Sequence, residues 1–205
     1  MSFLVFDLGQ VLLPIDPEAS LRAFAALGHY RVPFPPLTEP PFLDLETDAI
    51  DPATFRSFLR KSLGKAANNH TLDDAWNALL LPFHEPALSG VKKLKQRGHK
   101  IYLLSNTNRI HVKAIQKQCG PFAWSAFLRL FDQVFWSHEV GLRKPDPALF
   151  SLVQKAIHPP PGESLWFFDD NPDNVAAAKS LGWNALSFTY LDWQSSTKTP
   201  LALFG

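Results

Sequence analysis

Polar side chains that could take part in chemistry follow three short apolar runs in the chain. They are Asp7, the pair Ser105 and Asn106, and the pair Asp169 and Asp170. A fourth polar element is the loop 141–147, which carries Lys144 between Arg143 and a proline. If the three runs are neighbouring parallel strands, all these groups meet at the carboxyl edge of one sheet, where ligands of open α/β sheets bind.

Three carboxylates in one pocket repel one another. At about 4 Å and an effective dielectric constant near 20, each pair of unit charges costs about 4 kcal/mol. Either some of the carboxyl groups are protonated or a cation lies among them. Mg²⁺ prefers oxygen ligands and suits a site that also holds a phosphate. Lys144 and the donors of Ser105 and Asn106 would then contact phosphate oxygens, and Asp7 could attack phosphorus to give an aspartyl-phosphate.

The elements that must position these groups are indicated by the hydrophobic pattern. The runs 3–6, 101–104 and 165–168 do not alternate with polar residues, which is typical of strands buried on both faces. Helix-like stretches at 86–97, 109–119, 147–157 and 172–181 each end at or just before a glycine or proline. This alternation predicts an α/β fold with a Rossmann-like parallel sheet and helices on both faces. Asn108 and Asn171 are expected to cap the helices that follow them.

Residues 14–85 follow a different pattern. Helices are expected at 17–29, 52–64 and 72–81, and no run in the segment resembles a buried strand. Prolines at 33–41 form a connector, which could be a rigid linker within the domain or a polyproline ligand for another protein. The chain is therefore predicted to have an α/β core made of residues 1–13 and 86–205, with a helical cap, 14–85, inserted after the first strand.

Composition narrows the class of protein. The 205 residues include 20 Lys and Arg and 19 Asp and Glu, a net charge of +1, so no broad basic field favours nucleic acid or an anionic membrane. No apolar run approaches the roughly 18 residues of a membrane span, and the start lacks the basic region of a secretory signal. A cytoplasmic protein is expected. We also expect most of the seven histidines to lie at the surface and the segment 195–205 to be a loosely held terminus.

The four motifs resemble, in order, those of the haloacid dehalogenase-like (HAD) hydrolase superfamily. They are Phe6-Asp7-Leu8-Gly9-Gln10-Val11, Leu104-Ser105-Asn106, Lys144-Pro145 and Phe168-Asp169-Asp170-Asn171. The resemblance spans nearly the whole chain, and residues 14–85 match the helical cap of that superfamily. Within it, the longer stretches 105–109, 141–145 and 167–171 are most similar to the bacterial α-D-glucose-1-phosphate phosphatase branch.

The resemblance implies a role for each matching residue. Asp7 corresponds to the nucleophile and a metal ligand, and Lys144 to the lysine that neutralises phosphate and nucleophile. Ser105 corresponds to the phosphate-binding hydroxyl, with Asn106 beside it. Asp170 corresponds to the direct metal ligand and Asp169 to a second or water-mediated one. Dehalogenases of the superfamily lack this acidic pair, so the pair favours a Mg²⁺ phosphatase.

One position departs from most phosphatases of the superfamily. They carry a second Asp two residues after the nucleophile, which protonates the leaving group and later activates water. This chain has Gly9 there, whose backbone carbonyl can still bind Mg²⁺. The glucose-1-phosphatase branch also has glycine, and an anomeric oxygen depends less on an acid because it leaves more easily. Slow turnover is expected, and Asp16 is a conceivable substitute.

The expected function is Mg²⁺-dependent hydrolysis of a small phosphorylated metabolite, with α-D-glucose 1-phosphate as the first substrate to test. Two alternatives stay open. The glycine at position 9 could mark a non-catalytic protein that binds phosphate or a partner. Alternatively, the chain could be a phosphatase for lipid phosphates, which a cap tunnel lined by Phe and Trp would favour. The oligomeric state is not readable from the sequence.

Overall fold

A computed structural model describes residues 1–28, 37–64 and 66–204. Its centre is a five-stranded parallel sheet with the strand order β3-β2-β1-β4-β5. The strands are β1 (Phe3–Phe6), β2 (Lys100–Ser105), β3 (Gln133–Trp136), β4 (Leu165–Asp169) and β5 (Asn184–Ser187). The predicted α/β class and parallel sheet are therefore confirmed.

The register of the central strands brings their carboxyl ends level. Phe6 of β1 pairs with Leu103 of β2 on one side and with Phe168 of β4 on the other. The next backbone group, the Asp7 N–H, donates to the Phe168 carbonyl at 2.9 Å. As a result, the polar residues that follow these three strands share one edge of the sheet, as the sequence predicts.

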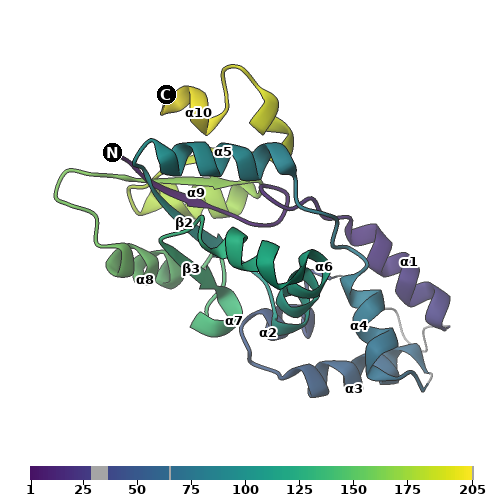
Figure 1. The fold of residues 1–205 in the computed structure, drawn as a ribbon. Coiled ribbons are helices and arrows are strands. Elements are labelled where there is room, and N and C mark those ends of the chain that lie inside the picture. Colours follow the sequence, from purple (N-terminus) through teal and green to yellow (C-terminus); the bar gives the residue numbers. More distant parts are fainter. Residues whose placement is uncertain (29–36, 65, 205) are drawn as a thin grey trace.

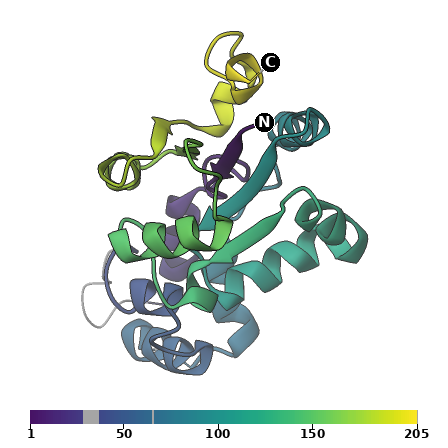
Figure 2. The ribbon, with the colours of Figure 1, turned by 90° about the vertical axis from the view of Figure 1, so that its left-hand side faces the viewer.

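Alternate residues of each strand are buried under helices on opposite faces of the sheet. Leu4 and Phe6 belong to one apolar cluster, under α5 (Glu85–Gln96) and α6 (Arg109–Leu128). Phe3 and Val5 belong to the other, under α8 (Pro147–Ile157) and α9 (Pro172–Ser180). Figure 2 shows the sheet between these two pairs of helices. Both faces of the sheet are covered, which accounts for strands that are apolar throughout.

A separate group of helices lies between β1 and α5 in the chain (Figure 1). It contains α1 (Pro17–Leu27), α2 (Phe42–Glu46), α3 (Pro52–Leu63) and α4 (Asn69–Asn77). These helices have their own apolar cluster, with the rings of Phe24, Phe42, Phe55 and Trp76 at its centre. Ile110, at the start of α6, also packs into it. We refer to α1–α4 as the cap helices.

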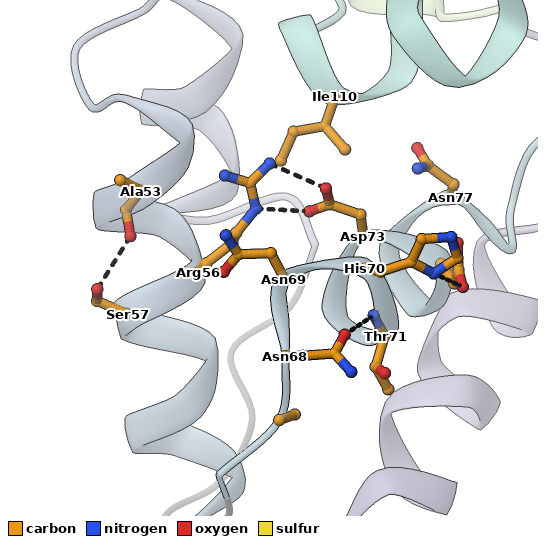
Figure 3. Close-up of polar contacts among 12 residues, drawn as sticks. Ala53, Arg56, Ser57, Asn68, Asn69, His70, Thr71, Asp73, Asn77 and Ile110 are labelled. Atoms are coloured by element: carbon orange, nitrogen blue, oxygen red, sulfur yellow. Dashed lines mark hydrogen bonds and ion pairs between the residues drawn. The ribbon is translucent and has the colours of Figure 1, made fainter. Parts of the chain in front are cut away.

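Polar contacts fix the cap helices locally (Figure 3). The Asp51 carboxylate accepts the Thr54 N–H at the start of α3, and the Asn68 side chain accepts the Thr71 N–H at the start of α4. Both satisfy backbone donors that a helix leaves free at its first turn. Arg56 of α3 meets Asp73 of α4 through Nε–Oδ1 and Nη2–Oδ2 bonds of 2.8 and 2.9 Å, which join the two helices.

Several boundaries differ from the prediction. The helix expected at 72–81 is α4, which begins at Asn69 and ends at Asn77, because Asn68 rather than a later residue supplies the cap. The helix expected to end at residue 119 does break at Gly120, whose φ is 79°, but Pro121 begins a second helical stretch. The short elements β3, β5, α2 and α7 (Ser137–Val140) were not predicted.

The expectation of a loosely held C-terminus is wrong. After η1 (Tyr190–Gln194), the short helix α10 (Pro200–Leu203) lies beside α5 (Figure 1). Phe204 packs its ring edge-on to Trp166, with centroids 5.0 Å apart. Arg97 donates to the Leu201 carbonyl at 3.1 Å. These contacts anchor the segment to the core.

Two further sequence expectations concern regions outside the core. The predicted proline connector lies outside the described residues over 32–36, while Pro40 and Pro41 directly precede α2. In the described part of the chain, no helix combines the length and the apolar character that crossing a bilayer requires.

Candidate active site

Asp7 stands at the carboxyl end of β1 with its side chain held on one oxygen. Oδ1 accepts the Leu8 N–H at 2.7 Å and faces the Lys144 ammonium at 2.8 Å. The described residues provide no hydrogen bond to Oδ2. This arrangement fixes the carboxylate in orientation and leaves one oxygen able to attack an electrophile.

Lys144 is almost completely buried beside Asp7, with 1% of its side chain exposed. Its Nζ contacts Asp7 Oδ1 at 2.8 Å, Asp169 Oδ2 at 2.6 Å and the Leu104 carbonyl at 2.9 Å. Three acceptors satisfy the three donors of an ammonium. The lysine of the Pro-containing loop therefore joins β1, β2 and β4 at a single point.

The two acidic residues after β4 lie in different environments. Asp169 is fully buried, and its Oδ1 accepts the Asn171 N–H and the Asn174 amide, both at 2.9 Å. With Lys144 on Oδ2, protein donors engage both oxygens of Asp169. Asp170 is only partly buried, and no side-chain hydrogen bond to it occurs among the described residues. Asp170 is therefore the freer of the two to bind a cation.

The protonation equilibria of the cluster reflect burial and crowding. Burial raises the pKa of Asp7 to about 8, Lys144 opposes this increase, and Asp169 adds to it. Burial also raises the pKa of Asp170, with Asp169 as the second cause. Burial disfavours the ammonium of Lys144, but Asp169 and Asp7 outweigh it and raise its pKa. Asp7 and Asp170 therefore resist full ionisation, although the charge of Lys144 favours it.

These residues fit a divalent metal ion. Ligand oxygens of Asp7, Asp169 and Asp170 lie within 4.8 Å of one another. Three carboxylates and one ammonium carry a net charge of −2 when ionised, which a divalent cation would balance. An all-oxygen donor set with hard carboxylates suits Mg²⁺. The half-buried Gly9 stands two residues after Asp7, where the family resemblance implies a further ligand, its backbone carbonyl.

A cavity of about 240 Å³ lies between this cluster and the cap helices. The core contributes Gly9, Ser105 and Asn106, while α2 and α4 contribute Glu46 and Trp76. Most of the remaining lining is aliphatic: Leu8, Leu13, Ile15, Leu37, Leu79, Leu80 and Ile115. A phosphate at the cluster would thus have space beside it for a small organic group.

The remaining predicted residues take definite positions. Ser105 is buried at the end of β2 and lines the cavity. Asn106 lines the cavity and also binds the backbone of Lys144. Its Nδ2 donates to the Lys144 carbonyl, and its Oδ1 accepts the Lys144 N–H. Asn108 and Asn171 cap α6 and α9, as predicted.

Two expectations about other side chains need correction or refinement. Of the six histidines in the described residues, His111 and His138 are buried and the other four are exposed or partly exposed, so the expectation of mostly surface histidines does not extend to these two. His111 enters the apolar junction between core and cap, where it stacks on Trp76. Asp16 pairs with Arg22 at 2.8 Å on the exposed side of α1 and does not line the cavity.

Sequence reasoning missed Glu46, the last residue of α2. Arg143 Nε donates to its Oε2 at 2.9 Å, across 97 residues of sequence. No motif contains Glu46, and the short helix that carries it has no periodic signal. Arg143, the residue before Lys144, indicates in the sequence that an acidic partner is needed, but it does not identify that partner.

A larger groove of about 510 Å³ lies on the outer side of α3, α4 and α6. It is lined by the Arg56–Asp73 pair, His70 and Asn77, which Figure 3 shows, and by the start of α6. It contains none of the residues predicted for the site. The smaller cavity beside Asp7 is therefore the one relevant to chemistry.

Comparison with known proteins agrees with this geometry. The family model of the haloacid dehalogenase-like hydrolases matches residues 44–182. The chain belongs to the haloacid dehalogenase-like hydrolases. A curated relative, the D-ribitol-5-phosphate phosphatase of Bacteroides thetaiotaomicron, is 29% identical over 193 residues, covering 88% of each chain. A sesquiterpene phosphatase of Aspergillus oryzae is 30% identical over 99 residues, which span 48% of this chain and 47% of the relative.

A solved HAD family enzyme from Bacteroides thetaiotaomicron, in a magnesium complex, superposes with a TM-score of 0.85. It is 30% identical, and the match covers 97% of this chain and 99% of that one. The predicted family membership, enzyme class and metal are confirmed: this HAD protein is a phosphoric monoester hydrolase that uses Mg²⁺. The assignment to the glucose-1-phosphate branch is not confirmed.

Proposed function

We propose that the HAD protein hydrolyses a small sugar or polyol phosphate, with Asp7 as the nucleophile. The observation that carries this proposal is the Asp7 carboxylate, fixed on Oδ1 by Lys144 beside an acidic pair. The two residues that follow Asp7 in the chain, Leu8 and Gly9, line a cavity. A carboxylate with one oxygen free can attack phosphorus and form an aspartyl-phosphate. Water then attacks the phosphorus of that intermediate and restores Asp7.

The other side chains act by position and charge. The Lys144 ammonium offsets the charge of the phosphate and of Asp7, which lowers the repulsion between two anions. Ser105 is the hydroxyl donor for phosphate oxygens. Asp7, Asp170 and the Gly9 carbonyl would hold Mg²⁺, with Asp169 as an indirect ligand. When bound, Mg²⁺ supplies Lewis-acid stabilisation of the charge that develops on the transferring phosphoryl group.

Support for a sugar or polyol phosphate comes from the ribitol-phosphate phosphatase, because the similarity covers most of both chains. The cavity is near the lower end of ligand-site volumes, which suits a small organic group. Glu46, Thr38 and His111 are the polar cap-side and junction residues that could contact hydroxyl groups. Within this class, α-D-glucose 1-phosphate is the first compound we would test.

A second candidate is a phosphate ester with an apolar organic group. The specific observation in its favour is the aliphatic lining of the cavity, together with Trp76. The similarity to a sesquiterpene phosphatase points the same way, although it covers only about half of each chain. Apolar lining stabilises an apolar substituent by removing it from water, by about 25 cal/mol for each Å² buried.

The test is phosphate release from a panel containing glucose 1-phosphate, ribitol 5-phosphate and an isoprenyl phosphate, with Mg²⁺ and with EDTA. Asp7→Asn is the matched control, since it keeps the side-chain shape and removes the nucleophile. Release that requires Mg²⁺ and Asp7 supports the proposal, and the ranking of kcat/KM decides between the two substrate classes. Binding of Mg²⁺ and phosphate without any turnover would instead support a non-catalytic role.

A further inference from the structure

The cavity beside the phosphate position contains an acidic side chain although the usual acid is absent at Gly9. Among the residues that line this cavity, Glu46 is the one with a carboxyl group. Asp16, the other candidate, forms an ion pair with Arg22 in which the two side chains are 40% and 66% exposed. Asp16 is thus engaged by Arg22 and is absent from the cavity lining, so it is not placed to serve a reaction there.

The position of Glu46 is fixed by the loop that carries Lys144. The Arg143 guanidinium binds Oε2 of Glu46, and Arg143 is joined directly to Lys144 by a peptide bond. The Glu46 side chain is 21% exposed, and no hydrogen bond to Oε1 occurs in the described part of the chain. One oxygen is therefore anchored while the other is available to a ligand in the cavity.

The electrostatic surroundings allow this carboxyl group to hold a proton. Burial raises the pKa of Glu46, and the neighbouring charges of Arg143 and Lys144 lower it, yet the net shift is upward. These two cations are the charged groups that act on Glu46 from the loop packed against α2. A carboxyl group with a raised pKa can act as an acid in one step and as a base in the next.

We propose that Glu46, supplied by the cap, is the general acid and base that replaces the residue missing at Gly9. The inference rests on the proposed phosphatase function. In the first step, the Asp7–phosphorus bond forms, the bond from phosphorus to the leaving oxygen breaks, and the Glu46 proton passes to that oxygen. In the second step, Glu46 takes a proton from water as its oxygen bonds to phosphorus and the Asp7–phosphorus bond breaks. The products are the alcohol and phosphate, with Glu46 protonated again.

The test compares Glu46→Gln with wild type on two substrates that differ in leaving group. One is the best alkyl phosphate of the panel, whose alkoxide needs a proton. The other is p-nitrophenyl phosphate, whose phenolate leaves without one. For the alkyl phosphate, kcat/KM should fall about a hundredfold or more, the lower range for a lost general acid. For p-nitrophenyl phosphate, kcat/KM should change much less, while kcat falls for both because hydrolysis of the intermediate loses its base.

Asp48→Asn is the matched control. In the described part of the chain, Asp48 forms a second ion pair between cap and core, with Arg109 through bonds of 2.9 and 2.8 Å, and does not line the cavity. Its φ of 57° is tolerated by asparagine, so the change removes the pair without straining the backbone. The control should keep both kcat/KM values within about twofold of wild type, since surface ion pairs contribute little.

The possible outcomes distinguish a failure of the Glu46 role from a failure of the proposed phosphatase function. Equal losses of kcat/KM for both substrates in Glu46→Gln, or no loss for the alkyl phosphate, would overturn the role of Glu46 and leave the phosphatase intact. A wild-type protein that releases no phosphate from either substrate would overturn the proposed function and the inference together. A thermal unfolding curve of Glu46→Gln that matches wild type shows that the loss is not one of folding.

Discussion

Asn106 holds Lys144 by both polar groups of its backbone. Its Nδ2 donates to the Lys144 carbonyl at 2.9 Å, and its Oδ1 accepts the Lys144 N–H at 2.8 Å, although the two residues are 38 positions apart. The pair ties the end of β2 to the loop before α8. It thereby places the ammonium between Asp7 and Asp169.

Asn106→Ala removes both bonds and should impair catalysis through Lys144. We expect a fall in kcat and a loss of roughly 1–3 kcal/mol in the free energy of unfolding, because partly buried backbone groups lose their partners. Steady-state kinetics and urea unfolding measure the two effects. An unchanged kcat in the folded variant would show that the contact does not position the lysine.

Asp170→Asn tests the metal site without breaking a protein hydrogen bond. In wild type, Mg²⁺ at about a hundred times its Kd should stabilise the folded state by about 2.7 kcal/mol, and the Tm should rise accordingly. In Asp170→Asn, the Mg²⁺-dependent rise should largely disappear, while stability in EDTA stays at or above wild type because a crowded carboxylate is gone. Asp173→Asn, an exposed acid on α9, is the control and should keep the full rise. An equal rise in Asp170→Asn would contradict the assignment.

Gly9→Asp tests the role of Glu46 by introducing a carboxyl group at position 9, where most phosphatases of the superfamily have one. A Cβ atom at this position would lie 3.6 Å from Ile15 Cδ1, an ordinary van der Waals contact, so a side chain fits. If Glu46 replaces the absent residue, Gly9→Asp should raise kcat strongly in the Glu46→Gln background and only slightly in wild type. Gly9→Ala in the same background should restore nothing. Equal effects of Asp and Ala would argue against any acid at this position.

His111 should make the protein sensitive to acid. Burial lowers its pKa to about 3, whereas in the unfolded chain it is about 6.5. Below pH 6.5 the unfolded state therefore binds a proton that the folded state does not, and stability falls by up to about 1.4 kcal/mol per pH unit down to about pH 3. Above pH 6.5 this contribution to stability is complete.

His111→Gln should flatten that part of the stability curve, measured by urea unfolding at a series of pH values. His70→Gln, at an exposed position, is the control and should leave the slope as in wild type. Because His111 Nδ1 also donates to Asn77 Oδ1 of α4 at 2.8 Å, some stability at neutral pH should be lost. The same acid slope in His111→Gln would assign the sensitivity to other groups.

The core of this fold could be predicted because its signals are local. The runs ending at Phe6, Leu104 and Phe168 are apolar on both faces, and the polar residue after each marks the strand end. The strand β3 escaped prediction because its four residues begin at an exposed edge, and β5 because polar residues flank it. For such short strands, pairing with a neighbour decides the conformation.

In the candidate site, too, some residues could be predicted from local motifs and others could not. Asp7, Lys144 and Asp169 stand in local motifs, and their contacts follow once the strands are aligned. Glu46 could not be found, because its partner Arg143 is 97 residues away and only the packing of α2 against the core brings them together. The burial of His111 likewise depends on the cap helices, which its own helix cannot reveal.

The most direct test of the account is whether phosphate becomes covalently attached to Asp7 during turnover. The enzyme is mixed with Mg²⁺ and its best substrate, quenched in acid within the first turnover, digested, and analysed by mass spectrometry. We predict one phosphate on Asp7 in the peptide that contains β1, absent from Asp7→Asn and from samples with EDTA. Steady release of phosphate with no such adduct at any quench time would contradict Asp7 as the nucleophile.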